Sequence, residues 1–401
     1  MQRPHISVAQ RGFSLIEVLV AMLIGMIAIV VVMQVFAVSE GYKRTTSGGS
    51  DAQVNGGLAL YLMEREIRMA GYGISDPGLL GCPAVRVWNS TLGTTSDVRM
   101  TPFEVNPVGV GAGADANTDV ILIAFGVADT SVVGVPIDQA NVATASFALK
   151  GQSFNRDGFR TGDLVIATQG TQCGMYEVTF APGTQPGCLA AVYAGPAKID
   201  ALTGTYKNYY NNCGNTTAVH NKATPLTTSA GAPFVAFSQA LGGQVFNLGQ
   251  SPVIKAYAVY QGALATCDMV NANCTNASAF QPVVSDIVSL RAVYMKDTSN
   301  PLDGVIDVVD HVRPVTATDW ASVQAVQIEV TARSGLKEKQ NAANACDITI
   351  DKTKPDLAQT WMGQGVAGAG IDLSTTSADW ACYRYKMFQT SIPLRNMIWT
   401  H

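Results

Sequence analysis

Residues 11–22 read Arg-Gly-Phe-Ser-Leu-Ile-Glu-Val-Leu-Val-Ala-Met, and they decide how the chain begins. A short basic leader ends at Gly12, and an apolar run of helix-spanning length begins at Phe13. From Val18 to Val38 the only strongly polar side chain is Gln34. A helix over this stretch rises by roughly 31 Å at about 1.5 Å per residue. That length is enough to cross the hydrocarbon core of a bilayer, so the stretch predicts a transmembrane helix.

Glu17 is the one charged side chain at the start of this apolar run. A carboxylate inside a bilayer costs about 2.5–3.5 kcal/mol on insertion scales, and so it indicates a function by default. The alternative is a carboxylate that snorkels to the membrane surface and has no function there.

The position of the small residue relative to the apolar core distinguishes two kinds of signal. A secretory signal is cleaved after its apolar core, whereas Gly12 precedes it, so cleavage there would leave the helix on the mature protein. Arg3 and Arg11 lie on the N-terminal side, which predicts a cytoplasmic leader and an exported remainder. An uncleaved signal anchor remains an alternative, but it explains neither Glu17 nor the junction between Gly12 and Phe13.

Residues 12–20 resemble the class III signal of type IV prepilins. The resemblance implies that a prepilin peptidase cleaves between Gly12 and Phe13 and that Phe13 becomes the N-methylated terminus. It also implies a subunit-assembly role for Glu17, whose carboxylate would contact the free amine of the first residue of a neighbouring subunit. The expected location is the inner membrane, crossed once with the C-terminal domain in the periplasm, and then the pilus.

The sequence predicts an α+β protein in which a long N-terminal helix precedes a large β-rich domain. We expect a leader over 1–12, a helix over 13–71 that is transmembrane over 13–38, and a periplasmic β-rich domain over 72–401, as one unit or two packed subdomains. Glycines weaken the middle of the helix, so a melted or kinked stretch is expected around 41–57. These glycines are Gly41, Gly48, Gly49, Gly56 and Gly57.

Strands are expected where alternating or β-branched residues are bounded by Gly, Asn, Asp and Pro. The predicted strands are Asp119–Phe125, Leu164–Thr168, Tyr176–Phe180, Ile254–Tyr260, Ile287–Tyr294 and Val323–Ala332. Turns are expected at 156–158, 182–183 and 302–304, where Gly follows Asp or Pro.

All eight cysteines follow the apolar run, and an exported chain with an even number of cysteines predicts disulfides. Short spacing favours two pairs, Cys267 with Cys274 and Cys346 with Cys382, while the full connectivity stays open. Buried free thiols are the alternative. The remaining candidates are Cys82, Cys173, Cys188 and Cys213.

Further motifs, in order along the chain, resemble the PilW family of minor pilins. They are Glu66–Tyr72, Gly81–Cys82, Gly162–Leu164, Ile287–Tyr294, Val326–Ser334, Tyr383–Phe388 and Ile392–Asn396. The resemblance implies a structural subunit of the minor-pilin complex that primes pilus assembly. It also implies a position at the pilus tip and links to cell adhesion and twitching motility. Implied partners are other minor pilins and the major pilin through the N-terminal helix, the prepilin peptidase and a tip adhesin. The alternative is a J-type minor pseudopilin of type II secretion, although the length of 401 residues and the cysteines favour the pilus protein.

Composition argues against several other functions. Two of the four histidines, His5 and His401, lie in the leader and at the last residue, so a histidine-based catalytic site or metal centre is not expected. We therefore predict no enzymatic activity, no cofactor and no metal site. The net charge of −4, without a run of Lys or Arg, gives no support for direct nucleic-acid binding. An oxygen-rich stretch at 297–310 lacks the EF-hand spacing for calcium.

Overall fold

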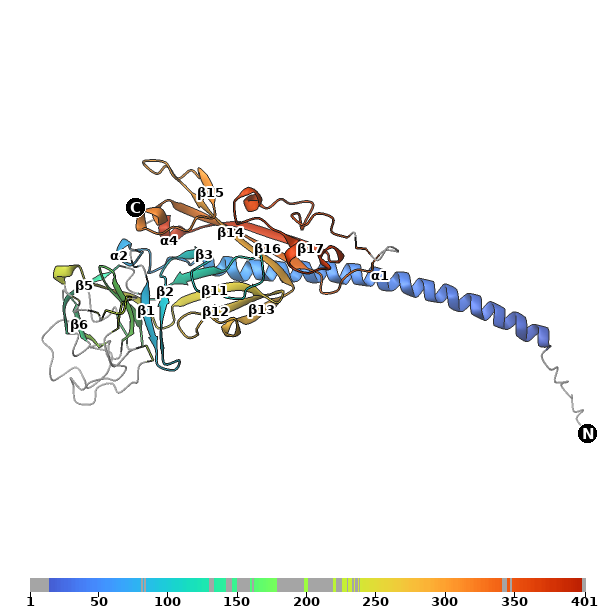
Figure 1. The fold of residues 1–401 in the computed structure, drawn as a ribbon, viewed down its shortest axis with the longest axis horizontal. Helices are drawn as coiled ribbons and strands as arrows, with labels where there is room; N and C mark the ends of the chain where they lie inside the picture. The colour runs from blue at the N-terminus through green and yellow to red at the C-terminus, as the bar shows by residue number, and fades with distance from the viewer. Residues whose placement is uncertain are drawn as a thin grey trace, which may run out of the picture.

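The computed structural model describes residues 14–80, 82, 84–129, 133–141, 146–149, 159–160, 162–178, 198–200, 219–220, 226–228, 230–232, 234, 237, 239–340, 345–346 and 348–398. A single long helix leads into a body built from three β-sheets, and the first half of the helix extends well beyond that body (Figure 1). The predicted α+β class is confirmed. The helices are α1 (Leu15–Ile67), α2 (Pro77–Leu80), α3 (Ala317–Ala321) and α4 (Arg395–Ile398), with short 3-10 turns at Gln239–Leu241, Ala277–Ala279, Met362–Gly365, Leu373–Thr375 and Trp380–Cys382.

The first sheet lies at the end of the body far from the amino terminus (Figure 1). Its eight strands run in the order β2-β1-β8-β7-β10-β5-β6-β9, and the pairings are antiparallel except between β1 and β8. Their bounds are β1 (Val85–Asn89), β2 (Thr94–Val98), β5 (Val135–Asn141), β6 (Ser146–Leu149), β7 (Leu164–Gln169), β8 (Gln172–Glu177), β9 (Lys198–Asp200) and β10 (Gln244–Gly249).

The second and third sheets enclose the second half of α1. The five-stranded sheet has the order β13-β12-β11-β4-β3, with β3 (Phe103–Val105), β4 (Ile121–Phe125), β11 (Val253–Tyr260), β12 (Ala263–Asp268) and β13 (Gln281–Ser285). The four-stranded sheet has the order β15-β14-β16-β17, with β14 (Ile287–Lys296), β15 (Val308–Asp310), β16 (Val323–Arg333) and β17 (Tyr385–Pro393). Both sheets are antiparallel throughout.

Most of the predicted strands are found where the sequence pattern places them. The segments predicted from Asp119, Leu164, Ile254, Ile287 and Val323 correspond to β4, β7, β11, β14 and β16. The strand predicted over 176–180 lies earlier in the chain, as β8, which ends at Glu177. It begins at Gln172, because a tight hairpin pairs Gln172 with Gln169 of β7. Residues 179–180 and the turns predicted at 156–158 and 182–183 lie outside the described residues.

The main core forms where the second half of α1 packs between two sheets. Ala52, Ala59, Met63 and Ile67 of α1 are completely buried, in one cluster with apolar residues of the five-stranded and four-stranded sheets. Full burial of a large side chain such as Met63 or Ile67 contributes about 1.5–3 kcal/mol of transfer free energy. A second cluster fills the space between the five-stranded and eight-stranded sheets. Burial of one stripe of α1 therefore sets its position on the body.

The melted stretch expected around 41–57 is wrong, because α1 is helical without interruption from Leu15 to Ile67. Two of its glycines face the four-stranded sheet at very close range. A Cβ atom on Gly56 would lie 2.3 Å from the ring of Phe388, and one on Gly48 would lie 2.9 Å from the Cβ of Ser334. The glycines therefore serve close packing, and the packing energy offsets their cost of about 1 kcal/mol each in helix propensity.

The interior of the four-stranded sheet contains charged side chains. Arg291 of β14 and Asp119 are almost fully buried and form an ion pair at 3.1 Å. Arg291 also donates to Asn117 and to the carbonyl oxygens of Gly368 and Gly370, so one side chain connects β14 to two separate loops. Removal of one partner of a buried pair typically costs about 3–5 kcal/mol, because the other charge is left unpaired.

Glu329 of β16 lies completely buried beside this ion pair. Its carboxylate accepts hydrogen bonds from the hydroxyl groups of Ser289, at 2.8 Å, and Thr331. Desolvation raises the pKa of Glu329 to about 7, although both hydroxyl groups and the charge of Arg291 act in the opposite direction. Glu329 therefore changes its charge near neutral pH.

We predict that Glu329→Gln flattens the pH dependence of stability. The folded protein holds the Glu329 proton up to about pH 7, whereas the unfolded chain releases it near 4.5. The contribution of Glu329 to stability is therefore fully present below pH 4.5 and falls by about 3 kcal/mol as pH rises to 7. Urea unfolding from pH 4 to 8 should show this fall in the wild type and not in the variant. Glu40→Gln, on an exposed face of α1, is the control, and equal pH profiles for Glu329→Gln and wild type would contradict the prediction.

We also predict opposite effects for alanine at two adjacent glycines of α1. Gly57→Ala has no atom within 4 Å of the new methyl group and should stabilise the protein by about 0.5–1 kcal/mol through helix propensity. Gly56→Ala gains the same propensity but collides with Phe388, and overpacking of this kind costs about 1–3 kcal/mol. Urea unfolding of the two variants in the same detergent measures the difference. Equal stability of the two variants would show that α1 does not pack as closely as described.

Candidate assembly site

The amino end of α1 is organised by Ser14 and Glu17. The backbone N–H of Ile16 donates to Oγ of Ser14 at 3.4 Å, and the backbone N–H of Ser14 donates to the Glu17 carboxylate at 3.2 Å. Ser14 and Glu17 thus form a capping box, which satisfies N–H groups that a helix otherwise leaves unpaired at its start. The Glu17 carboxylate is thus directed toward Ser14. Ser14 would be the second residue of the chain after the cleavage expected between Gly12 and Phe13. Gly12 and Phe13 lie outside the described residues.

The first half of α1 exposes apolar side chains on all sides. In the described part of the chain, α1 is the one helix long and apolar enough to cross a membrane, and none of its most apolar window is buried against the body. Large side chains from Leu15 to Val38 are mostly more than half exposed. An apolar surface of this extent is not stable in water, so it requires a lipid or protein environment. The helix is therefore fitted to anchor the chain in a membrane.

The exit of α1, meaning the residues just after its C-terminal end at Ile67, is held by residues from the opposite end of the chain. Nδ2 of Asn396 in α4 donates to the carbonyl oxygens of Met69 and Ala70, at 3.1 and 3.0 Å. Gly71 has a φ of +87°, and its N–H donates to the carbonyl of Ala124 at 3.0 Å. Two of the sequence motifs quoted above, at 66–72 and 392–396, therefore meet at this point. The sequence motifs gave no sign that they are in contact.

Glu66 fixes the last turn of α1 to the five-stranded sheet. Its carboxylate accepts hydrogen bonds from Nζ of Lys255 and from the hydroxyl of Tyr257, both at 2.7 Å. Burial, reinforced by the negative charge of Glu66, raises the pKa of Tyr257, so its hydroxyl stays protonated and remains the donor. Sequence reasoning did not identify Lys255 or Tyr257, although both belong to the strand predicted from Ile254.

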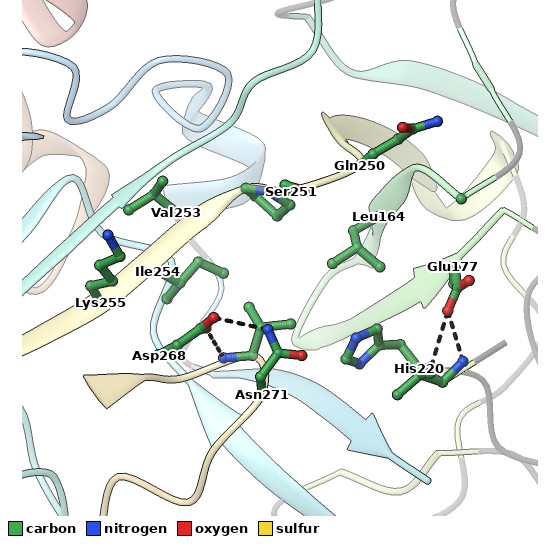
Figure 2. A pocket seen from close by; sticks show the side chains of 14 residues that line it. Leu164, Glu177, His220, Gln250, Ser251, Val253, Ile254, Lys255, Asp268 and Asn271 are labelled. Carbon is green, nitrogen blue, oxygen red and sulfur yellow. Dashed lines mark hydrogen bonds between the residues drawn. The ribbon is translucent and has the colours of Figure 1, made fainter. Parts of the chain in front are cut away.

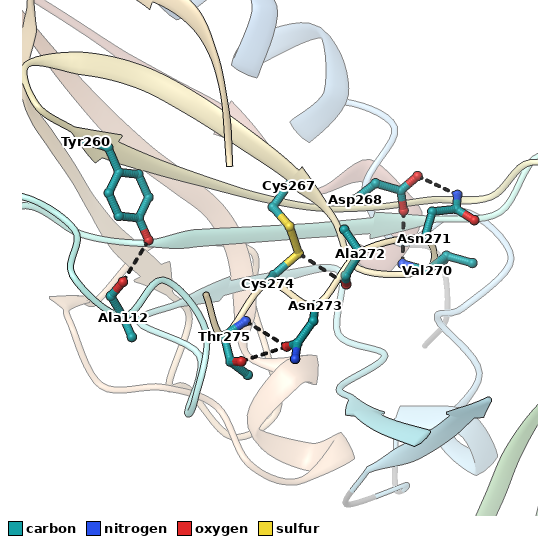
Figure 3. Close-up of a disulfide and its surroundings, with 10 residues drawn as sticks. All are labelled: Ala112, Tyr260, Cys267, Asp268, Val270, Asn271, Ala272, Asn273, Cys274 and Thr275. Atoms are coloured by element: carbon teal, nitrogen blue, oxygen red, sulfur yellow. Dashed lines mark hydrogen bonds between the residues drawn. A yellow bond between two sulfur atoms is a disulfide. The ribbon is translucent and has the colours of Figure 1, made fainter. Parts of the chain in front are cut away.

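Three disulfides are present among the described cysteines, and they connect segments of the β-rich body. They are Cys82–Cys173, Cys267–Cys274 and Cys346–Cys382. The last two are the pairs that short spacing favours, while Cys188 and Cys213 lie outside the described residues. Figure 3 shows the bond from Cys267, at the end of β12, to Cys274 in the following asparagine-rich loop, where Asp268 and Asn273 accept hydrogen bonds from nearby N–H groups. The disulfide and these turns together shape the loop.

A cavity of about 490 Å³ lies between the eight-stranded and five-stranded sheets (Figure 2). Several of its polar side chains already have partners in the protein. Asp268 accepts from the N–H of Val270 and from Asn271, Glu177 accepts from the N–H groups of Val219 and His220, and Lys255 pairs with Glu66. These contacts hold the cavity walls together.

Clusters suited to a metal ion are not found within the described residues. In the oxygen-rich stretch, Asp297 accepts from the N–H groups of Ser299 and Gly304, and Asp307 accepts from Thr298 and Ser299. These carboxylates therefore act as caps for the turn in which they lie.

Comparison with known proteins yields two family matches, one at each end of the chain. Residues 8–33 match the prokaryotic N-terminal methylation motif, and residues 255–396 match the type IV pilus-assembly protein W family, PilW. The second match runs from β11 to α4, so it contains the whole four-stranded sheet and the residues that hold the exit of α1. No curated protein and no solved structure was found to match the chain. The two matches together support a type IV pilus-related pilin with a prepilin signal, and residues 255–396 are similar to the PilW family.

Proposed function

We propose that this protein is a minor pilin, a structural subunit without enzymatic activity that belongs to the complex priming pilus assembly and sits at the pilus tip. Before assembly it would be held in the inner membrane by the first half of α1, with the β-rich body in the periplasm. Its partners would be other minor pilins and the major pilin, through α1, and a tip adhesin.

The observation that carries the proposal is the division of α1 into two halves. The first half is apolar and exposed, whereas the second half is embedded in the core of the body. Because the two halves form one continuous helix, the position of the first half in a membrane or pilus fixes the position of the body. The size of the body favours a terminal position, since a large domain is most easily accommodated where no further subunit has to pack above it.

Glu17 supports the proposal through its chemistry. Its carboxylate is directed toward the start of the helix, where it accepts from the N–H of Ser14. After cleavage the same carboxylate would be available to the amine of Phe13 in a neighbouring subunit. Pairing of the two charges inside the membrane would offset the cost of burying either one alone.

We expect processing between Gly12 and Phe13. Intact-mass measurement of membrane-extracted protein should show a chain that begins at methylated Phe13, and Gly12→Val should block the cleavage. A mature chain that retains Met1 in the wild type would contradict the proposed maturation.

We expect Glu17→Ala to spare folding and membrane insertion but to reduce incorporation into the assembly complex by about tenfold or more. Loss of a charge from the bilayer makes insertion easier, while the body, which begins dozens of residues later, is unaffected. The magnitude follows from the loss of about 1.4 kcal/mol or more of charge pairing. Pilus number and recovery of partner pilins should be compared at equal protein levels.

Two variants serve as controls for this experiment. Glu40→Ala removes the same side chain from the same helix outside the apolar run, and Glu17→Asp retains a carboxylate at the critical position. Both should assemble better than Glu17→Ala. If Glu17→Ala assembles as well as the wild type, Glu17 is only tolerated and has no part in subunit pairing.

A further inference from the structure

The connection from β14 to α3 carries an exposed strand edge. It includes β15, which is the outermost strand of the four-stranded sheet and pairs only with β14, from Tyr294 opposite Asp310 to Lys296 opposite Val308. Figure 1 shows β15 and the adjoining loop projecting from the body. The backbone N–H and C=O groups on the outer side of such a strand form a template for another strand.

Aliphatic side chains are concentrated along this connection and are exposed. They are Leu302, Val305, Ile306, Val308, Val312 and Val315, with exposed fractions between 37% and 65%. Residues 305–309 read Val-Ile-Asp-Val-Val, a composition with high strand propensity. A concentration of aliphatic residues on a strand edge is typical of a binding surface for another chain.

Few of the features that usually prevent an edge strand from pairing with another chain are found along 302–312. Neither Lys nor Pro occurs from 302 to 312. The one charged residue between Val305 and Val309 is Asp307, and its carboxylate turns back to accept from the N–H and hydroxyl of Thr298, at 2.8 and 3.2 Å. The Asp307 carboxylate is thus held by the protein's own loop. The short length of β15 limits uncontrolled pairing, but the strand-forming run extends beyond the three paired residues.

The surface around β15 carries negative charge, so a partner with positive charge would be favoured. Lys296 pairs with Asp310 at 2.8 Å, and Arg313 pairs with Glu104 at 2.9 Å, so both nearby cations are engaged. Asp303 and Asp307 form no ion pair in the described part of the chain. A partner strand with Lys or Arg would complement these carboxylates.

A second copy of this chain is a poor occupant of the same edge. Antiparallel self-pairing centred between Val308 and Val309 would place Asp307 of one copy opposite Asp310 of the other. Like charges directly opposite each other destabilise a strand pair. In this register self-pairing is disfavoured, so a different chain fits the edge better.

We propose that residues 305–310 accept an extended segment of another protein, in which β-branched apolar residues alternate with Lys or Arg, as an added antiparallel strand. Main-chain hydrogen bonds to β15 supply the affinity, and the aliphatic and acidic side chains supply the selectivity. This site is separate from α1, and its test involves no pilus, so its failure would leave the proposed function standing.

The test uses the full chain in detergent micelles and two labelled nine-residue peptides, one alternating Val with Lys and the other alternating Val with Asp. The Val–Lys peptide should bind and slow hydrogen exchange of the amides from 305 to 310, and the Val–Asp peptide should bind at least tenfold more weakly. Equal binding of both peptides, or protection confined to other segments, would overturn the proposal.

Variants then localise the binding. Val308→Lys should weaken binding of the Val–Lys peptide at least tenfold, whereas Val108→Lys, at a more exposed valine outside this edge, should leave it unchanged. Asp303→Asn keeps the acceptor for the N–H of Val305 and removes only the charge, so it should weaken binding by about two- to fivefold even if Val308→Lys does not fold. Unchanged affinity in Asp303→Asn would refute the charge argument. A dimer that forms without peptide and is lost in Val308→Lys would show that a second copy occupies the edge.

Discussion

The close contact between α1 and the four-stranded sheet is the constraint on which the rest of the structure depends. At Gly56 the helix backbone approaches Phe388 so closely that a methyl group does not fit. This approach brings Ala52, Ala59 and Met63 into the core with residues from both flanking sheets. The helix is thus a central element of the body and not an attached anchor. Any force on the apolar half of α1 reaches the sheets through this packing.

The sequence pattern predicted the parts of the fold whose signals are local. The apolar run from Phe13 and strands such as β11 and β14 are continuous enough to be recognised from composition and alternation. Strands such as β12 and β17 were missed, because Ala, Thr and Gln interrupt their patterns and their order depends on pairing with neighbours. The glycines of α1 were misread for a related reason. Propensity alone predicts weakness, and only the tertiary contact with Phe388 explains why Gly56 is present.

In the candidate site, too, the sequence indicates residues with an unusual local context but does not indicate contacts between distant residues. Glu17 stands out in the sequence because a charge in an apolar run is unusual. Asn396 does not stand out, and nothing near it predicts a contact with Met69 and Ala70. The buried pair of Arg291 and Asp119 is likewise formed by residues far apart in the sequence. Such contacts depend on topology, which one sequence without relatives does not determine.

The contact of Asn396 with the exit of α1 has a consequence for the order of synthesis. The helix leaves the ribosome long before Asn396, which binds its C-terminal end. Until α4 has been synthesised, the carbonyl oxygens of Met69 and Ala70 lack their Asn396 partner, and β16 lacks β17. The second half of α1 therefore remains uncovered on one side until β17 has been made and has paired with β16. Chaperones would have this interval in which to act, and a chain truncated before β17 would expose the apolar stripe of α1 and become a target for proteolysis.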